Sequence, residues 1–159
     1  MRVVFLDRDG VINKNAKDFY VLEWKDFEFM PGIIEAIKLL NERKIPVYIV
    51  SNQSAVGRGL MTMDELKHIN DQMLKEITKK GAHIDDIFIC PHSPEDNCDC
   101  RKPKTGLFKQ AEDKYDIDFK DSWFIGDSET DIEAGKKMGC RTHLLKKGED
   151  IIKVIRKII

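Results

Sequence analysis

Residues 2–9 have the sequence Arg-Val-Val-Phe-Leu-Asp-Arg-Asp, in which a run of consecutive apolar residues leads to a pair of aspartates. A strand that is apolar at nearly every position is typical of a parallel sheet covered on both faces, whereas a half-exposed strand alternates. The stretch therefore predicts a buried strand over residues 2–6 of an α/β protein, with Asp7 and Asp9 placed where that strand ends.

Short apolar runs and helical periodicity alternate from this strand to the end of the chain. Further strands are predicted at residues 47–50, 87–89, 123–125 and 141–145. Helices are predicted after Pro31 and Gly32, between the capping pair Thr62 and Glu65 and the terminating Gly81, and at about residues 105–115, 129–138 and 149–158. This order predicts a doubly wound, mainly parallel sheet with helices on both faces. We expect a single domain over residues 1–159.

The composition limits the class of protein further. The 159 residues are 42% hydrophobic and 35% charged, and the formal net charge is -1, from 27 basic and 28 acidic residues. This balance gives no electrostatic reason to expect a nucleic acid partner. No apolar run approaches the length of about 20 residues that a membrane span needs, and no secretory signal is visible. We therefore expect a cytoplasmic protein without membrane contacts, and nothing in the sequence requires more than a monomer.

Polar residues gather where the predicted strands end. They are Asp7 and Asp9 after the first strand, Ser51 and Asn52 after the second, and Asp127 and Asp131 after the strand at residues 123–125. Taken singly, the aspartates are typical loop or helix caps. In an open parallel sheet, however, the carboxyl ends of the strands meet at one edge. Three or four carboxylates at that edge favour a hard cation with oxygen ligands, and Mg²⁺ is the expected ion.

The third predicted strand leads into a stretch rich in cysteine. Its spacing is C-x-H-x₅-C-x-C, formed by Cys90, His92, Cys98 and Cys100. Three thiolates and one imidazole complete a tetrahedral zinc site without an open position, which indicates a structural ion. The plainer alternative is a set of buried thiols beside a surface histidine. Because cysteines of a reducing compartment are more often thiols or metal ligands than disulfides, we expect a zinc-binding loop inserted at residues 90–104.

Four segments resemble, in chain order, the motifs of the haloacid dehalogenase-like (HAD) phosphatases. They are Phe5–Asn13, Ser51–Ser54, Arg101–Pro103 and Gly126–Asp131. Each follows the strand at which that family carries it, and together they span nearly the whole chain. One such motif would be weak evidence, whereas four in order are specific. The resemblance implies a HAD-like fold and the activity of a magnesium-dependent phosphatase.

The resemblance also implies a role for each motif residue. Asp7 is the expected nucleophile, which forms an aspartyl-phosphate, and Asp9 is the expected general acid and base. Ser51 and Lys102 are expected to contact the phosphoryl oxygens, where charge stabilisation dominates catalysis. The expected magnesium ligands are Asp7, Asp127 and the backbone carbonyl of Asp9, with Asp131 supporting the site.

The zinc loop narrows the resemblance to one branch of the family. That branch contains the D-glycero-D-manno-heptose 1,7-bisphosphate phosphatases and the phosphatase domain of histidinol-phosphate phosphatase, and both lack a large cap domain. The first implies removal of the 7-phosphate from a sugar bisphosphate, and the second implies a step of histidine biosynthesis. The segments Ser51–Ser54 and Gly57–Gly59 favour the heptose substrate, whereas the short cysteine spacing resembles the histidinol enzyme. Candidate substrate contacts are Asn52, Arg58 and Arg101.

Two alternatives come from other classes of protein. A receiver-type phospho-acceptor domain is also doubly wound and also forms an aspartyl-phosphate, but its acceptor follows the third strand, where this chain has Cys90. A zinc-organised binding module without activity would not need Asp7, Asp9, Lys102 and Asp127. We therefore favour an enzyme whose binding partner is a small phosphate ester.

Overall fold

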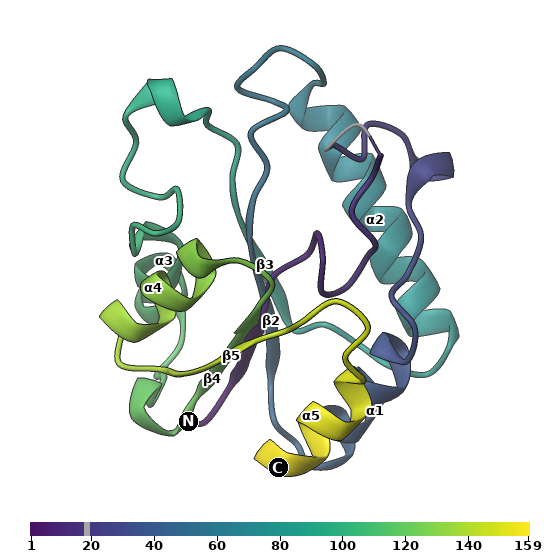
Figure 1. Cartoon of the computed structure of the whole chain (residues 1–159), viewed down its shortest axis with the longest axis vertical. Helices are drawn as coiled ribbons and strands as arrows, with labels where there is room; N and C mark the ends of the chain where they lie inside the picture. The colour runs from purple at the N-terminus through teal and green to yellow at the C-terminus, as the bar shows by residue number, and fades with distance from the viewer. Residues whose placement is uncertain (18–19) are drawn as a thin grey trace.

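The structure, a computed structural model, describes residues 1–17 and 20–159. Within these residues the centre is a sheet of five strands in the order β3-β2-β1-β4-β5, and all neighbouring strands are parallel. The strands are β1 Val4–Leu6, β2 Val47–Asn52, β3 Asp86–Cys90, β4 Trp123–Gly126 and β5 Arg141–Leu144. Figure 1 shows the sheet between two groups of helices. The predicted doubly wound parallel sheet is confirmed.

β1 lies in the middle of the sheet because it is apolar on both faces. Val4 and Leu6 pack into one buried cluster, and Val3 and Phe5 pack into the cluster on the opposite face. The strand pairs with β2 and β4, and Leu6 is in register with Ile49 of β2. Parallel strands in this register end at the same edge, so the residues that follow them meet there.

Helices cover both faces of the sheet, as predicted (Figure 1). The helices are α1 Ile33–Glu42, α2 Met63–Lys79, α3 Gly106–Lys114, α4 Glu129–Lys137 and α5 Ile151–Ile158. α1 and α5 pack against each other over one face, and apolar residues of α2 join the same cluster. α3 and α4 contribute to the cluster on the other face. The two buried faces of β1 are thus each covered by amphipathic helices.

The helix ends follow their capping signals. The Thr62 side chain accepts a hydrogen bond from the Glu65 backbone N–H at 3.1 Å, and α2 begins at the next residue, Met63. The last helix begins at Ile151 rather than at the predicted residue 149, because the Asp150 carboxylate caps it by accepting from the Ile152 backbone N–H. Short 3₁₀ turns lie at Trp24–Asp26, Pro94–Asp96 and Phe119–Asp121. They were not predicted because three residues are too few to show periodicity.

In the part of the chain that the structure describes, no helix has both the length and the apolar character that a bilayer span requires.

Candidate active site

Three aspartates meet beyond the carboxyl ends of β1 and β4. Asp7 directly follows β1, Asp127 directly follows β4, and Asp131 lies in the first turn of α4. One carboxylate oxygen of each residue lies within 4.8 Å of those of the other two. Carboxylates this close repel one another unless a cation lies among them. The group has the oxygen chemistry and spacing of a divalent-cation site.

Two glycines allow the chain to pass close to these aspartates. A Cβ atom on Gly10 would lie 1.8 Å from Asp127 Oδ2, and the Gly10 φ of +90° also favours glycine. A Cβ on Gly126 would lie 2.3 Å from the Cβ of Asp131. The backbone of the loop after β1 and of the end of β4 therefore lies directly against the acidic cluster. A larger residue at Gly10 or Gly126 would push the aspartates apart.

Lys102 supplies the positive charge inside this cluster. Its Nζ lies 3.1 Å from Asp7 Oδ1 and 2.6 Å from Asp131 Oδ1, and it donates to the Val50 carbonyl at 2.9 Å. The residue is 3% exposed, so both ion pairs are shielded from water. Burial alone lowers the pKa of Lys102, but the charges of Asp7 and Asp131 outweigh it, and the net shift is upward. The ammonium is therefore held in its charged form with an acceptor for each of its three protons.

Asp7 is a buried carboxyl group whose ionised form is disfavoured by its surroundings. Burial raises its pKa well above the ordinary value, Lys102 acts in the opposite direction, and the neighbouring aspartates add to the rise. Burial also raises the pKa of Asp127, although a hydrogen bond from Asn15 opposes this shift. Both upward pKa shifts are caused first by burial, and the neighbouring Asp131 carboxylate adds to each. A cation among them would favour their ionised forms.

Asp9 and Ser51 lie beside this cluster and share one neighbour, Gln53. Asp9 accepts hydrogen bonds from Arg8, Asn13 and Gln53, and Ser51 Oγ accepts from Gln53 Nε2 at 2.6 Å. Ser51 is 1% exposed at the end of β2. The expected acid–base residue and the expected phosphate-binding hydroxyl are thus joined through a glutamine whose contacts the sequence pattern did not indicate.

The three candidate substrate contacts differ in their surroundings. The Asn52 side-chain amide donates to the Lys102 carbonyl at 3.1 Å and accepts from the Lys102 N–H at 3.0 Å. Asn52 therefore fixes the backbone of the lysine in this structure. Arg101 is partly buried, and its Nη1 has no hydrogen-bond partner within residues 1–17 and 20–159. Arg58 is exposed in the loop after β2.

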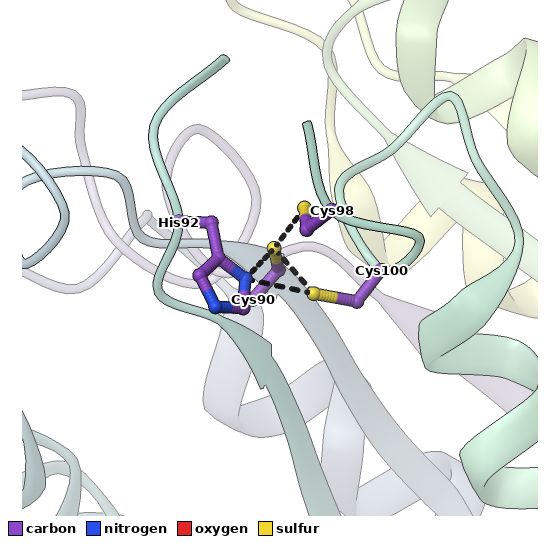
Figure 2. Close-up of side chains that lie close together, drawn as sticks. All are labelled: Cys90, His92, Cys98 and Cys100. Carbon is purple, nitrogen blue, oxygen red and sulfur yellow. Dashed lines mark hydrogen bonds between the residues drawn. The ribbon is translucent and has the colours of Figure 1, made fainter. Parts of the chain in front are cut away.

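The cysteine-rich loop brings its four predicted metal ligands together (Figure 2). Cys90 Sγ lies 3.6 Å from His92 Nδ1 and 3.5 Å from Cys98 Sγ, and Cys100 Sγ lies 3.3 Å from His92 Nδ1. The Cys90–Cys100 sulfur distance is shorter, at 2.7 Å. The edges of a tetrahedron with zinc–sulfur bonds of about 2.3 Å are about 3.8 Å long, so the other three distances are close to those of a zinc site and the Cys90–Cys100 pair would have to separate by about 1 Å.

The protonation of these thiols also depends on their surroundings. Burial raises the pKa of the Cys98 thiol, but hydrogen bonds from the Arg101 backbone and from Cys90 outweigh it and lower that pKa to about 6. Burial raises the pKa of Cys140 to about 12, and this fourth cysteine lies in the core, outside the cluster. Arg101 directly follows Cys100 and precedes Lys102, so the cluster anchors the segment that carries the buried lysine.

The fold and this edge of the sheet together define a class of protein. A parallel α/β sheet that gathers aspartates and a buried lysine beyond its strand ends is suited to phosphoryl transfer, in which positioning and charge stabilisation dominate. The HAD-hydrolase-like family model matches residues 99–154. The D-glycero-α-D-manno-heptose-1,7-bisphosphate 7-phosphatase of Campylobacter jejuni is 42% identical over 144 residues, covering 91% of this chain and 81% of the relative.

Two further relatives agree with this assignment. The D-glycero-β-D-manno-heptose-1,7-bisphosphate 7-phosphatase of Pseudomonas aeruginosa is 36% identical over 149 residues, covering 94% of this chain and 83% of the relative. The crystal structure of D,D-heptose 1,7-bisphosphate phosphatase from B. bronchiseptica, complexed with magnesium and phosphate, superimposes with a TM-score of 0.92. It is 32% identical and covers 99% of this chain and 98% of its own. The chain belongs to the HAD-like phosphatase family.

Proposed function

We propose that this chain is a magnesium-dependent phosphatase that removes the 7-phosphate from D-glycero-D-manno-heptose 1,7-bisphosphate. The observation that carries the chemistry is the buried contact of Lys102 with Asp7 and Asp131, beside Asp127. This contact supports the proposal because it brings together a carboxylate for the proposed nucleophile, a cation for the phosphoryl group and carboxylates for a metal. A receiver-type domain would instead carry its acceptor aspartate after the third strand, where this chain has Cys90 at the end of β3.

Magnesium fits the residues present. Three carboxylates converge, of which Asp7 and Asp131 pair with Lys102. The Asp9 carbonyl accepts no hydrogen bond within the described residues. We assign Asp7, Asp127 and the Asp9 carbonyl as ligands, with Asp131 supporting the site through Lys102. The ion would neutralise charge on the carboxylates and on the phosphoryl oxygens.

The remaining chemistry is assigned to side chains of the chain itself. Asp7 attacks the phosphorus atom, and the bond to the leaving oxygen breaks as Asp9 protonates that oxygen. Water then attacks the phosphorus of the aspartyl-phosphate, Asp9 accepts its proton, and Asp7 is released as a carboxylate. Ser51 and Lys102 contact the phosphoryl oxygens through both steps. Asn52 keeps Lys102 in place through the paired backbone contacts described above.

We choose the substrate from the activities for which the relatives are named. Both anomer-specific types of heptose bisphosphate phosphatase are more than 30% identical to this chain. Histidinol phosphate, the alternative from the cysteine spacing, gains no support from them. Arg58 and Arg101 are the cationic side chains that we assign to the distal part of a bisphosphate. Arg101 Nη1 has no hydrogen-bond partner among the described residues, and Arg58 is exposed in a loop after β2.

A comparison of kcat/KM over three substrates tests this function. We expect the α or β anomer of heptose 1,7-bisphosphate to exceed histidinol phosphate by at least about 100-fold, since a second phosphate adds charged contacts that histidinol phosphate cannot make. The product should be heptose 1-phosphate, identified by ³¹P NMR. A higher kcat/KM for histidinol phosphate would reverse the assignment of the substrate, and failure on all three esters would overturn the phosphatase itself.

We also propose that Cys90, His92, Cys98 and Cys100 bind one structural zinc ion, and that residues 90–104 form an insertion within a single domain over residues 1–159. The support is the convergence of three sulfur atoms and one imidazole nitrogen (Figure 2). The ion would connect the end of β3 to the segment before Lys102. Its proposed role is to hold that lysine against Asp7.

Replacement of one ligand should remove the zinc. Elemental analysis of purified Cys100→Ser protein is expected to show well below the one ion per chain of the native protein, with a fall in thermal midpoint. Cys140→Ser is the matched control, because Cys140 is also a buried cysteine but lies outside the cluster. It should keep about one zinc per chain. Native protein without zinc would refute the metal site.

A further inference from the structure

The carboxylate of Asp9 is fixed more firmly at one oxygen than at the other. Oδ1 accepts from Arg8 Nη2 at 3.0 Å, Arg8 Nε at 3.2 Å and Asn13 Nδ2 at 2.9 Å. Among the described residues, Oδ2 accepts only from Gln53 Nε2, at 3.1 Å. A carboxylate oxygen has about two lone-pair sites. Oδ1 is therefore saturated, and Oδ2 is the oxygen with capacity left for a proton.

The Oδ1 side has a rigid support. Arg8 is 1% exposed, its Nη1 donates to Asn70 Oδ1 of α2 at 3.0 Å, and its guanidinium lies 5.9 Å from the centre of the Phe27 ring. A buried guanidinium held by a helix side chain and an aromatic ring has little freedom to move. The Arg8 and Asn13 contacts thus restrain the Asp9 carboxylate at Oδ1, and its remaining freedom is the torsion about the Cβ–Cγ bond, in which the two oxygens move together.

Gln53 restrains the same torsion from the other oxygen. Its Nε2 donates one hydrogen to Asp9 Oδ2 and the other to Ser51 Oγ, and its backbone N–H donates to the Cys90 carbonyl at 2.8 Å. The reversed amide would place Oε1 against a carboxylate, so Asp9 itself determines the orientation of the amide. The glutamine is 5% exposed and has no hydrogen left for solvent. It therefore sets the position of Oδ2 relative to the Ser51 hydroxyl.

We propose that Gln53 is a positioning residue for the acid–base step, which aims Asp9 Oδ2 at the leaving oxygen while the phosphoryl group contacts Ser51. The inference rests on the proposed function, because it assumes that Asp9 is the general acid. Without Gln53 the Cβ–Cγ torsion of Asp9 is restrained at Oδ1 alone, so Oδ2 points less consistently at the leaving oxygen and protonation of that oxygen becomes less efficient. The loss depends on the leaving group, since a sugar alkoxide needs a proton and p-nitrophenolate leaves without one.

Gln53→Met tests this inference, because methionine matches glutamine in length and has no hydrogen-bond donor. The measurement is kcat/KM, which reports the steps up to loss of the leaving group. We expect a fall of about 10- to 100-fold for heptose 1,7-bisphosphate and of less than about 3-fold for p-nitrophenyl phosphate. Gln53→Glu keeps the shape but presents an acceptor to Asp9, and it should show the same difference between the two substrates.

Ser122→Ala is the matched control for a purely structural effect. Ser122 is also buried, and its Oγ accepts from the Val3 N–H and donates to the Asp118 carbonyl. It directly precedes β4 and so lies at the amino-terminal end of the strands, away from the candidate site. It should leave the ratio of the two kcat/KM values unchanged. Equal falls for both substrates in the Gln53 variants, or no fall, would overturn the positioning role. If the native protein hydrolyses neither ester, the proposed function fails instead.

Discussion

Asp7→Asn is expected to reduce kcat for heptose 1,7-bisphosphate by about 10⁴-fold or more, because it removes the proposed nucleophile rather than a contact that supports it. The amide has the same shape as the carboxylate but cannot form the aspartyl-phosphate. Phosphate release under saturating substrate and magnesium is the measurement. Asp113→Asn, an exposed aspartate of α3, is the matched control and should retain native kcat.

The same substitution should not weaken the fold. The pKa of Asp7 is raised in the folded state, first by burial, so at neutral pH the ionised carboxylate costs folding free energy. That penalty is absent when the pH lies below the unfolded pKa and grows as the pH rises above it. Asp7→Asn removes the penalty, and metal-free variant protein should therefore unfold at the native midpoint or above it at pH 7. Magnesium should stabilise the native protein more than the variant.

Lys102→Met is expected to damage both stability and activity. Lys102 is 3% exposed and pairs with Asp7 at 3.1 Å and Asp131 at 2.6 Å, so its loss leaves buried carboxylates without a counter-charge. Removing one partner of a buried ion pair lowers the free energy of unfolding by about 3–5 kcal/mol. Chemical denaturation without metal measures this loss. The loss of charge on the phosphoryl group should also lower kcat by about 10³-fold.

The metal dependence of the Lys102→Met defect distinguishes charge from packing. Added Mg²⁺ should recover part of the lost stability, because it supplies positive charge to the same carboxylates. Lys109→Met, at an exposed position of α3, should change stability by less than about 0.5 kcal/mol. A Lys102 variant as stable as native protein in the absence of metal would show that the buried ion pairs do not hold the site together.

The fold was largely predictable because its signals are local. The apolar run before Asp7 indicates a strand buried on both faces, and β1 lies in the middle of the sheet with helices on each face. The capping pair at Thr62 and Glu65 predicts the start of α2 within one residue. Periodicity alone starts the final helix at residue 149, two residues too early, because it does not show that Asp150 is the residue that caps the helix.

For the site, the sequence predicts which residue types take part and that they gather at the carboxyl ends of the strands, but not their contacts. The strand-end rule places Asp7 and Asp127 together, but it does not show that Lys102 reaches both Asp7 and Asp131. That contact joins segments 95 residues apart and depends on the path of the whole loop after β3. The contacts of Gln53 escaped prediction for a similar reason. A glutamine two residues after a serine shows no pattern, and its partner Asp9 is 44 residues away.

The most direct test of the central claim is to trap the phosphoryl group on Asp7. Asp9→Asn should still transfer phosphate from p-nitrophenyl phosphate, whose leaving group needs no acid, but it should hydrolyse the aspartyl-phosphate slowly for lack of a base. We expect a burst of about one p-nitrophenolate per chain. After denaturation and borohydride reduction, mass spectrometry should find homoserine at position 7. Steady turnover without homoserine at that position, or a label on another residue, would contradict the assignment of Asp7 as the nucleophile.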